Sequence, residues 1–106
     1  KTDIQGWRLE RIFRNERPSV VLHLAAHVNV RRSVEDPVFD AQVNVLGTMN
    51  VLQQAVRHGV RKLVFSSSGG AIYGEQELGP ASESHATNPL SPYGISKLAM
   101  EQYAFM

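Results

Sequence analysis

The chain has 106 residues, of which 42% are apolar and 20% charged, and its formal net charge is +1. This is the composition of one small globular domain, and the small net charge gives no indication of a nucleic-acid partner or an acidic membrane surface. The lack of cysteine excludes disulfides and thiol catalysis, and with no apolar run of membrane-spanning length and no signal peptide a cytoplasmic protein is expected.

Two elements are predicted near the beginning of the chain. Residues 7–16 carry Leu9, Ile12 and Phe13 at helical spacing, which predicts a short amphipathic helix that ends before Pro18. Residues 19–26 form a nearly continuous apolar run rich in branched side chains. Such a run is typical of a parallel strand that is buried on both faces. The polar residues that follow, 28–37, are predicted to form a loop.

The longest periodic segment, residues 39–58, predicts a helix that Gly59 caps at its C-terminus. A glycine inside a helix costs about 1 kcal/mol relative to alanine, so Gly47 predicts a close approach to a strand or a ligand. Residues 62–66 predict the next strand, which makes a βαβ unit with two parallel strands. The apolar stripe expected to face the core consists of Val45, Met49, Leu52 and Val56.

The second predicted strand is followed by the small and polar residues 66–74. Open α/β sheets build their binding sites at the C-terminal ends of parallel strands, so this segment is a candidate site. Residues 75–92 then form a long polar loop with three prolines. Loops of this length are usually functional or disordered.

A last helix is predicted from Ser91, because a hydroxyl cap followed by Pro92 is a favourable helix start. Tyr93 and Lys97 then project from the same face, one turn apart. A neighbouring ammonium group and a helix N-terminus both favour a phenolate, so this tyrosine could take and return a proton. A lone Tyr-x-x-x-Lys is also common by chance on solvated helix faces, and its meaning depends on the motifs upstream.

Four motifs stand in order along the chain: residues 23–26 (His-Leu-Ala-Ala), Asn44-x-x-Gly47-Thr48, the serines 66–68 and Tyr93-x-x-x-Lys97. Together they resemble the middle of an extended short-chain dehydrogenase/reductase of the NAD-dependent epimerase/dehydratase family. Within that family the resemblance is to the nucleotide-sugar epimerases, and it covers essentially the whole chain.

This resemblance implies an α/β fold that is part of a doubly wound, Rossmann-like parallel sheet, with a βαβ unit and flanking helices and incomplete at both ends. Residues 1–106 would be the middle part of an NAD-binding domain. The glycine-rich turn that binds pyrophosphate would precede Lys1, and the domain that grips the sugar would follow Met106. The chain by itself is then expected to be inactive.

The resemblance also assigns catalytic roles. Tyr93 resembles the catalytic base, and Lys97 resembles the lysine that holds the nicotinamide ribose and favours the phenolate. Ser68 resembles the catalytic hydroxyl that hydrogen-bonds the sugar oxygen. Ser67 is the alternative, because Gly69 and the glycine after it make the local register ambiguous.

Further residues resemble the positions that contact NAD. At the end of the first strand small side chains let a ribose and a nicotinamide approach the backbone. Val43 stands where related epimerases often have a polar cofactor contact, and for Asn44 a structural role is an equal alternative. The complete set of expected cofactor-binding residues is Leu24, Ala25, Ala26, His27, Val28, Val43, Asn44, Ser66, Tyr93 and Lys97.

The implied reaction is epimerisation at C4 of a UDP-hexose through a transient 4-keto sugar, with NAD as cofactor and a homodimer as the expected assembly. Related dehydratases carry a carboxylate just after the catalytic hydroxyl, and here Gly69 and Gly70 stand there. A nucleotide-sugar dehydratase or 4-reductase, and a non-catalytic NAD-binding scaffold or truncated fragment, remain alternatives. No metal site is expected, because His23 and His27 lie four residues apart along a strand, too far to share an ion.

Overall fold

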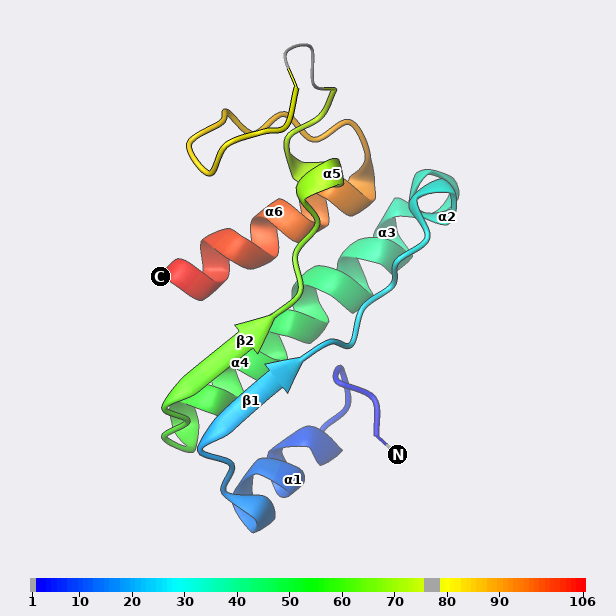
Figure 1. Ribbon diagram of the computed structural model, residues 1–106. Helices are drawn as coiled ribbons and strands as arrows, with labels where there is room; N and C mark the ends of the chain where they lie inside the picture. The colour runs from blue at the N-terminus through cyan, green and yellow to red at the C-terminus, as the bar shows by residue number, and fades with distance from the viewer. Residues whose placement is uncertain (1, 76–78) are drawn as a thin grey trace.

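The computed structural model describes residues 2–75 and 79–106 (Figure 1). The strands pair in parallel, with Val20 opposite Lys62 and His23 opposite Phe65, which confirms the predicted βαβ unit. In chain order the elements are α1 (Arg8–Glu16), β1 (Val20–His23), α2 (Val30–Glu35), α3 (Pro37–Ala41), the π-helical segment η1 (Gln42–Leu46), α4 (Gly47–Arg57), β2 (Lys62–Phe65), α5 (Gly69–Ile72) and α6 (Pro92–Phe105).

The apolar core lies between the helices α1 and α4 and one face of the sheet. Leu9, Phe13, Val51 and Ala55 form this core, and side chains of both strands pack against it. Ile12, which shares the predicted helical stripe, is 42% exposed. The helix predicted at 7–16 is otherwise confirmed, and it ends where Arg17 adopts a left-handed conformation.

The other face of the sheet is open among the described residues, since Val20 and Leu22 are 53% and 64% exposed. The prediction of a strand buried on both faces is therefore wrong for this chain, because the described helices cover one face only. Regular pairing is also shorter than predicted and ends at His23, so residues 24–26 continue beyond the strand.

A nearly continuous helical rod of α3, η1 and α4 connects the two strands (Figure 1). It starts at Pro37, two residues before the predicted helix, because the Asp36 side chain accepts a hydrogen bond from the Phe39 N–H at 3.0 Å and caps it. Gly59 follows its C-terminal end with φ of 67°, as the predicted cap requires. The π-helical turn inside the rod was not predicted.

The apolar stripe predicted on this rod is wrong at its end, where Val56 is 83% exposed. The buried face of α4 instead carries Thr48, Val51 and Ala55. Hydrophobicity did not mark this face because it holds small and polar side chains, such as Thr48, whose hydroxyl pairs with His23 Nε2.

Gly47 allows a close approach, but the neighbour is neither a strand nor a ligand. A Cβ atom at this position would lie 2.7 Å from Cδ1 of Ile4 in the N-terminal segment. The same segment is held by a hydrogen bond from Asn50 Nδ2 to the Ile4 carbonyl oxygen at 2.6 Å.

The loop predicted at 28–37 contains the short helix α2. Asn29 caps it by accepting a hydrogen bond from the Arg32 N–H at 3.0 Å, a local signal that the polar composition concealed. The short helix α5 follows the serine cluster and was also not predicted. Of the long loop predicted at 75–92, residues 76–78 lie outside the described residues, and residues 79–90 contain neither helix nor strand.

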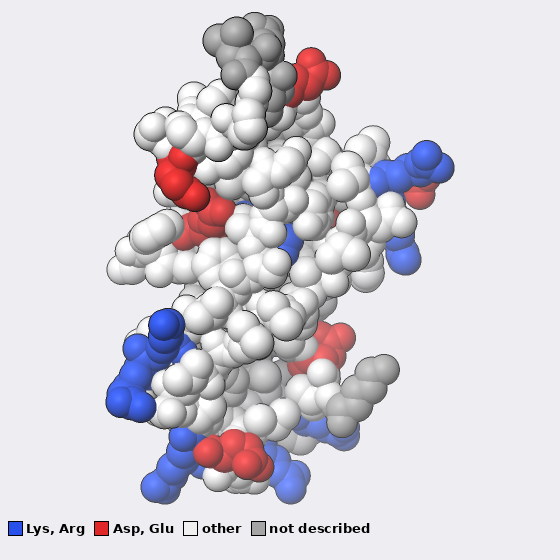
Figure 2. All heavy atoms as spheres, viewed as in Figure 1, with Lys and Arg blue, Asp and Glu red and all other residues white. Residues whose placement is uncertain are grey.

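No helix in the described part of the chain is long and apolar enough to cross a bilayer. Figure 2 shows that cationic side chains gather at the end of the molecule where the strands begin. The exposed cations in this region are Arg8, Arg11, Arg14, Arg17, Arg57, Arg61 and Lys62. The opposite end, where the strands finish, is where α5 and the start of α6 lie (Figure 1).

Helix α6 begins as predicted, with Ser91 as its cap and Pro92 in the first turn. The Ser91 hydroxyl accepts a hydrogen bond from the Gly94 N–H at 3.1 Å. Gly94 lets this turn lie directly on α5, because a Cβ atom there would be 2.5 Å from the Ala71 carbonyl oxygen and 3.0 Å from Pro89 Cβ.

We expect Gly94→Ala to destabilise the complete gene product that contains this chain by about 1–3 kcal/mol, because the new methyl group meets rigid backbone. Chemical denaturation measures the free energy of unfolding. Gly70→Ala is the matched control, since no heavy atom lies within 4 Å of its added Cβ. A Gly94→Ala variant that is as stable as the control would contradict the close packing of α6 on α5.

Candidate functional site

The candidate site lies where the two strands end and α6 begins. Lys97 is only 3% exposed, and its Nζ donates a hydrogen bond to the Ser66 carbonyl oxygen at 2.9 Å. This bond joins α6 to the residue that follows β2. Lys97 Nζ also lies 5.8 Å from the centre of the Tyr93 ring. The structure therefore brings Tyr93 and Lys97 together with the serines that follow β2.

Tyr93 is 8% exposed and belongs to the first turn of α6. Its backbone N–H donates to the hydroxyl of Ser33 on α2 at 3.1 Å, and that hydroxyl donates to the Val30 carbonyl oxygen at 2.6 Å. Ser33 itself is completely buried. Two serines, one local and one 60 residues away in sequence, thus hold the turn that carries the tyrosine.

The three serines after β2 have different environments. Ser66 is exposed, while Ser67 and Ser68 are half-buried. The Ser67 hydroxyl oxygen is enclosed and has no hydrogen-bond partner within residues 2–75 and 79–106. Ser68 stands at the start of α5, and its hydroxyl makes no capping bond there.

The residues after β1 form a lip at the same end of the sheet. Leu24, Ala25 and Val28 are exposed, and Ala26 and His27 are half-buried. This arrangement fits the expected approach of a flat cofactor to small side chains and backbone at a strand end.

Asn44 is completely buried on η1, and its side chain clamps the backbone of the lip. Its Oδ1 accepts from the His27 N–H at 2.9 Å, and its Nδ2 donates to the His27 carbonyl oxygen at 2.9 Å and to Asp40 Oδ1 at 3.0 Å. Both amide hydrogens are therefore in use. The contacts agree with the structural alternative for Asn44, while its neighbour Val43 is half-buried.

The two histidines of β1 and its lip have separate partners and do not converge. His23 Nε2 lies 2.9 Å from Thr48 Oγ1, and His27 Nδ1 lies 3.0 Å from Asp40 Oδ1. Among the described residues no group of three potential metal ligands of the His, Cys, Asp or Glu type occurs.

The titratable groups near α6 affect one another's pKa values. Burial lowers the pKa of the Lys97 ammonium group, and the Asp40 carboxylate opposes this effect. Burial also lowers the pKa of His23, and the positive charge of Lys97 lowers it further. A buried imidazole that is neutral at neutral pH thus lies near a buried amine.

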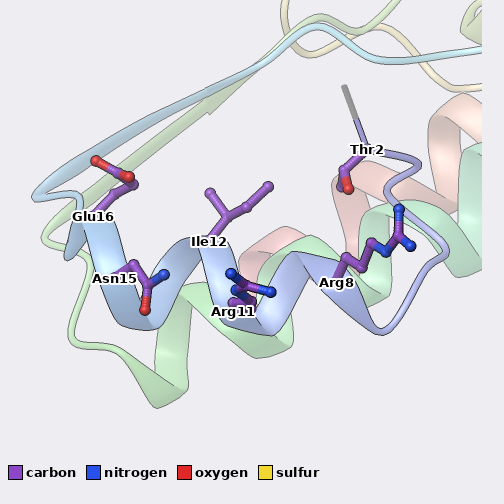
Figure 3. Close-up of a pocket in the computed structure, with 6 residues that line it drawn as sticks. All are labelled: Thr2, Arg8, Arg11, Ile12, Asn15 and Glu16. Atoms are coloured by element: carbon purple, nitrogen blue, oxygen red, sulfur yellow. The ribbon is translucent and has the colours of Figure 1, made fainter.

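A pocket elsewhere on the molecule involves none of the predicted site residues (Figure 3). It lies along α1, where the side chains of Arg8, Arg11 and Ile12 line it together with Asn15 and Glu16. The predicted catalytic residues lie at the other end of the strands, on or beside α5 and α6.

Sequence reasoning missed Ser33, Asp40 and Thr48 as parts of this site. Asp40 and Asn44 are four residues apart, one turn of the predicted helix. This spacing could have predicted two polar side chains that interact on one helix face. Ser33 gave no signal of its own, because its partner Tyr93 is remote in sequence.

Comparison with known proteins finds a family model and close relatives. The family model described as GDP-mannose 4,6 dehydratase matches residues 1–106. A putative UDP-glucose 4-epimerase of Methanocaldococcus jannaschii is 48% identical over 101 residues, which are 95% of this chain and 33% of that protein. The UDP-glucose 4-epimerase of Mycolicibacterium smegmatis is 46% identical over 106 residues, which are 100% of this chain and 34% of that protein.

Solved structures agree with these relatives. The Thermus thermophilus UDP-glucose 4-epimerase in complex with NAD superposes with a TM-score of 0.94 at 48% identity, covering 98% of this chain and 34% of that one. The Thermotoga maritima enzyme with UDP-glucose gives a TM-score of 0.94 at 42% identity, with the same coverage. The chain thus spans about a third of the length of the proteins it matches.

The buried His23 predicts a pH-dependent stability. The unfolded chain takes up a proton on this residue near its ordinary pKa of about 6.5, whereas the folded chain resists protonation. We therefore expect the free energy of unfolding of the complete gene product to fall as the pH drops from 7.5 to 5.5.

Urea denaturation at both pH values should show a smaller fall in the His23→Gln variant than in the wild type. His85→Gln is the control for loss of an imidazole, because His85 is exposed in the loop before α6. An equal fall in the wild type and in His23→Gln would contradict the assignment.

Proposed function

Because the chain belongs to the NAD-dependent epimerase/dehydratase family, we propose that its complete gene product is an NAD-dependent nucleotide-sugar 4-epimerase that interconverts UDP-glucose and UDP-galactose. The observation that carries the proposal is the buried Lys97. Its Nζ donates a hydrogen bond to the Ser66 carbonyl oxygen, and it lies one helical turn from Tyr93. This arrangement joins a candidate base to the strand end that carries a candidate hydroxyl. The relatives named as UDP-glucose 4-epimerases support the choice of substrate.

The residues of the lip and of α6 fit NAD as the cofactor. Leu24, Ala25 and Val28 leave an exposed strand end, with Ala26, His27 and Val43 half-buried beside it. Ser66 follows β2, and Lys97 on α6 donates a hydrogen bond to its carbonyl oxygen. When bound, NAD would supply a reversible hydride acceptor, as it is the group that carries the redox chemistry in such enzymes.

The chain's own part in the reaction is to hold the sugar and move one proton. The Tyr93 phenolate would accept the proton of the hexose C4 hydroxyl group, while the Ser68 hydroxyl hydrogen-bonds the same oxygen. The Lys97 ammonium favours the phenolate by its charge. Ser68 is preferred to Ser67, because the Ser67 hydroxyl is enclosed and does not face an open space. With the C4 hydrogen lost as hydride, the product is a 4-keto sugar, which would turn over and take the hydride back on its other face.

Dehydration is the main alternative, since the matching family model is described by a dehydratase. That reaction needs a general acid next to the catalytic hydroxyl. In this chain Gly69 and Gly70 follow Ser68 and begin α5, so no carboxylate is present there. Glu75 and Glu83 are exposed residues of the segment beyond. Epimerisation or simple 4-reduction is therefore favoured.

We also propose that the chain is the middle part of an NAD-binding domain. The open sheet face, with Val20 and Leu22 exposed, offers apolar surface for the remainder of such a domain. A glycine-rich pyrophosphate-binding turn before residue 1 and a sugar-binding domain after residue 106 would complete it.

A homodimer through helices is the proposed assembly. Its support is an apolar surface on α3 and η1, where Val38 and Leu46 are 65% and 57% exposed beside Ala41 and Val45.

We expect Tyr93→Phe in the complete gene product to lower turnover of UDP-galactose to UDP-glucose by at least about 10²-fold, because the proton acceptor is lost. Separation of the two nucleotide sugars by chromatography measures the rate. Tyr103→Phe is the matched control, because Tyr103 is an exposed tyrosine of the same helix. Unchanged turnover in Tyr93→Phe would remove the tyrosine from the mechanism.

A further inference from the structure

A buried carboxylate near the site has no part in the proposed proton transfer. Asp40 on α3 is completely buried, and its Oδ2 has no hydrogen-bond partner among the described residues. Its other oxygen, Oδ1, lies 3.0 Å from both His27 Nδ1 and Asn44 Nδ2. A buried charge is costly unless other charges or hydrogen bonds balance it, so its retention here requires an explanation.

The hydrogen bonds of Asn44 fix the roles of the groups around Asp40. The Asn44 Oδ1 accepts from the His27 backbone N–H, so Nδ2 is the amide donor and Asp40 Oδ1 is the acceptor. His27 Nδ1 then also donates to Asp40 Oδ1, which leaves its Nε2 as the ring acceptor in the neutral form. Asp40 therefore orients both side chains of the clamp that holds the lip after β1.

Asp40 and Lys97 are both buried, on the helices α3 and α6 that pack against each other. The helices α2, α3, η1, α4 and α5 all pack against α6. From these elements Asp40 is the buried carboxylate, and the charged residues of α2 and α4 are exposed. Asp40 raises the pKa of Lys97 against the larger effect of burial, and the buried His23 on β1 is the other group linked to Lys97. His27, which contacts Asp40, and Tyr93, on α6 itself, are further titratable neighbours.

We propose that Asp40 is a positioning residue of this site, whose buried carboxylate balances the ammonium group of Lys97 and holds the His27–Asn44 clamp at the strand end. This inference rests on the proposed epimerase function for its catalytic consequence. Its electrostatic content, a favourable interaction between Asp40 and Lys97, does not depend on that function.

The test uses Asp40→Asn in the complete gene product. An asparagine side chain of the same shape can still accept both hydrogen bonds at Oδ1, so the variant removes the charge and keeps the clamp. Asp36→Asn is the matched control, because Asp36 is an exposed carboxylate that caps the same helix and asparagine caps equally well.

The catalytic readout is the pH dependence of kcat for UDP-galactose. Without the balancing charge Lys97 loses its proton more readily, so the alkaline limb of the Asp40→Asn profile should move to lower pH, with KM nearly unchanged. The Asp36→Asn profile should coincide with the wild type. An Asp40→Asn profile with an unmoved alkaline limb would overturn the proposed catalytic consequence, even if the rate were uniformly lower.

The second readout is stability and needs no activity. As long as Lys97 carries its charge, Asp40→Asn should unfold at a lower urea concentration than the wild type. This gap should narrow as the pH rises and Lys97 loses its proton, because the lost attraction then no longer matters. A gap that is constant with pH would show that the two charges do not interact and would overturn the proposal.

If Asp40→Asn does not fold, the double variant Asp40→Asn, Lys97→Met still tests the proposal. Removing both charges should restore the folded state that the single change loses, as expected for coupled residues. A double variant that is no more stable than Asp40→Asn would contradict the coupling. If the wild type does not epimerise UDP-galactose but the stability results hold, the proposed function fails and the charge pair stands.

Discussion

The candidate site depends on one hydrogen bond, which Lys97 Nζ donates to the Ser66 carbonyl oxygen at 2.9 Å. An ammonium group that is 3% exposed loses most of its hydration, and the protein must replace it with acceptors and with negative charge. Ser66 supplies the acceptor and Asp40 the charge. Because the bond spans from α6 to the end of β2, it also sets where Tyr93 stands relative to the serines.

Directional hydrogen bonds are concentrated where the strands end, although Ile72 on α5 and Met100 on α6 are buried apolar side chains there. At the beginning of the strands Phe13 and Val51 belong to a core held by burial of apolar surface. At their ends the interior is held by directional bonds, such as those of Asn44 to the lip backbone and of Ser33 to the first turn of α6. Directional bonds fix positions more closely than apolar contacts, which suits a region where reacting groups must be oriented.

Much of the fold could be predicted because its signals are local. The first strand was predicted from its apolar run, and the start of α6 from the Ser91 cap and Pro92. The one-turn spacing of Tyr93 and Lys97 predicted that they share a helix face. The π-helical turn and the buried polar face of α4 could not be predicted, since they depend on partners far along the chain. For the same reason Ser33 remained unnoticed, whereas the spacing of Asp40 and Asn44 was a local signal that the prediction did not use.

The most direct test of the account uses the purified complete gene product with UDP-galactose and no added cofactor. The account predicts conversion to UDP-glucose and release of NAD from the protein on denaturation, because the site is proposed to retain its cofactor through the catalytic cycle. Release of NAD without conversion would place the substrate or the reaction elsewhere in the family. Neither conversion nor bound NAD would contradict the account and favour a non-catalytic scaffold.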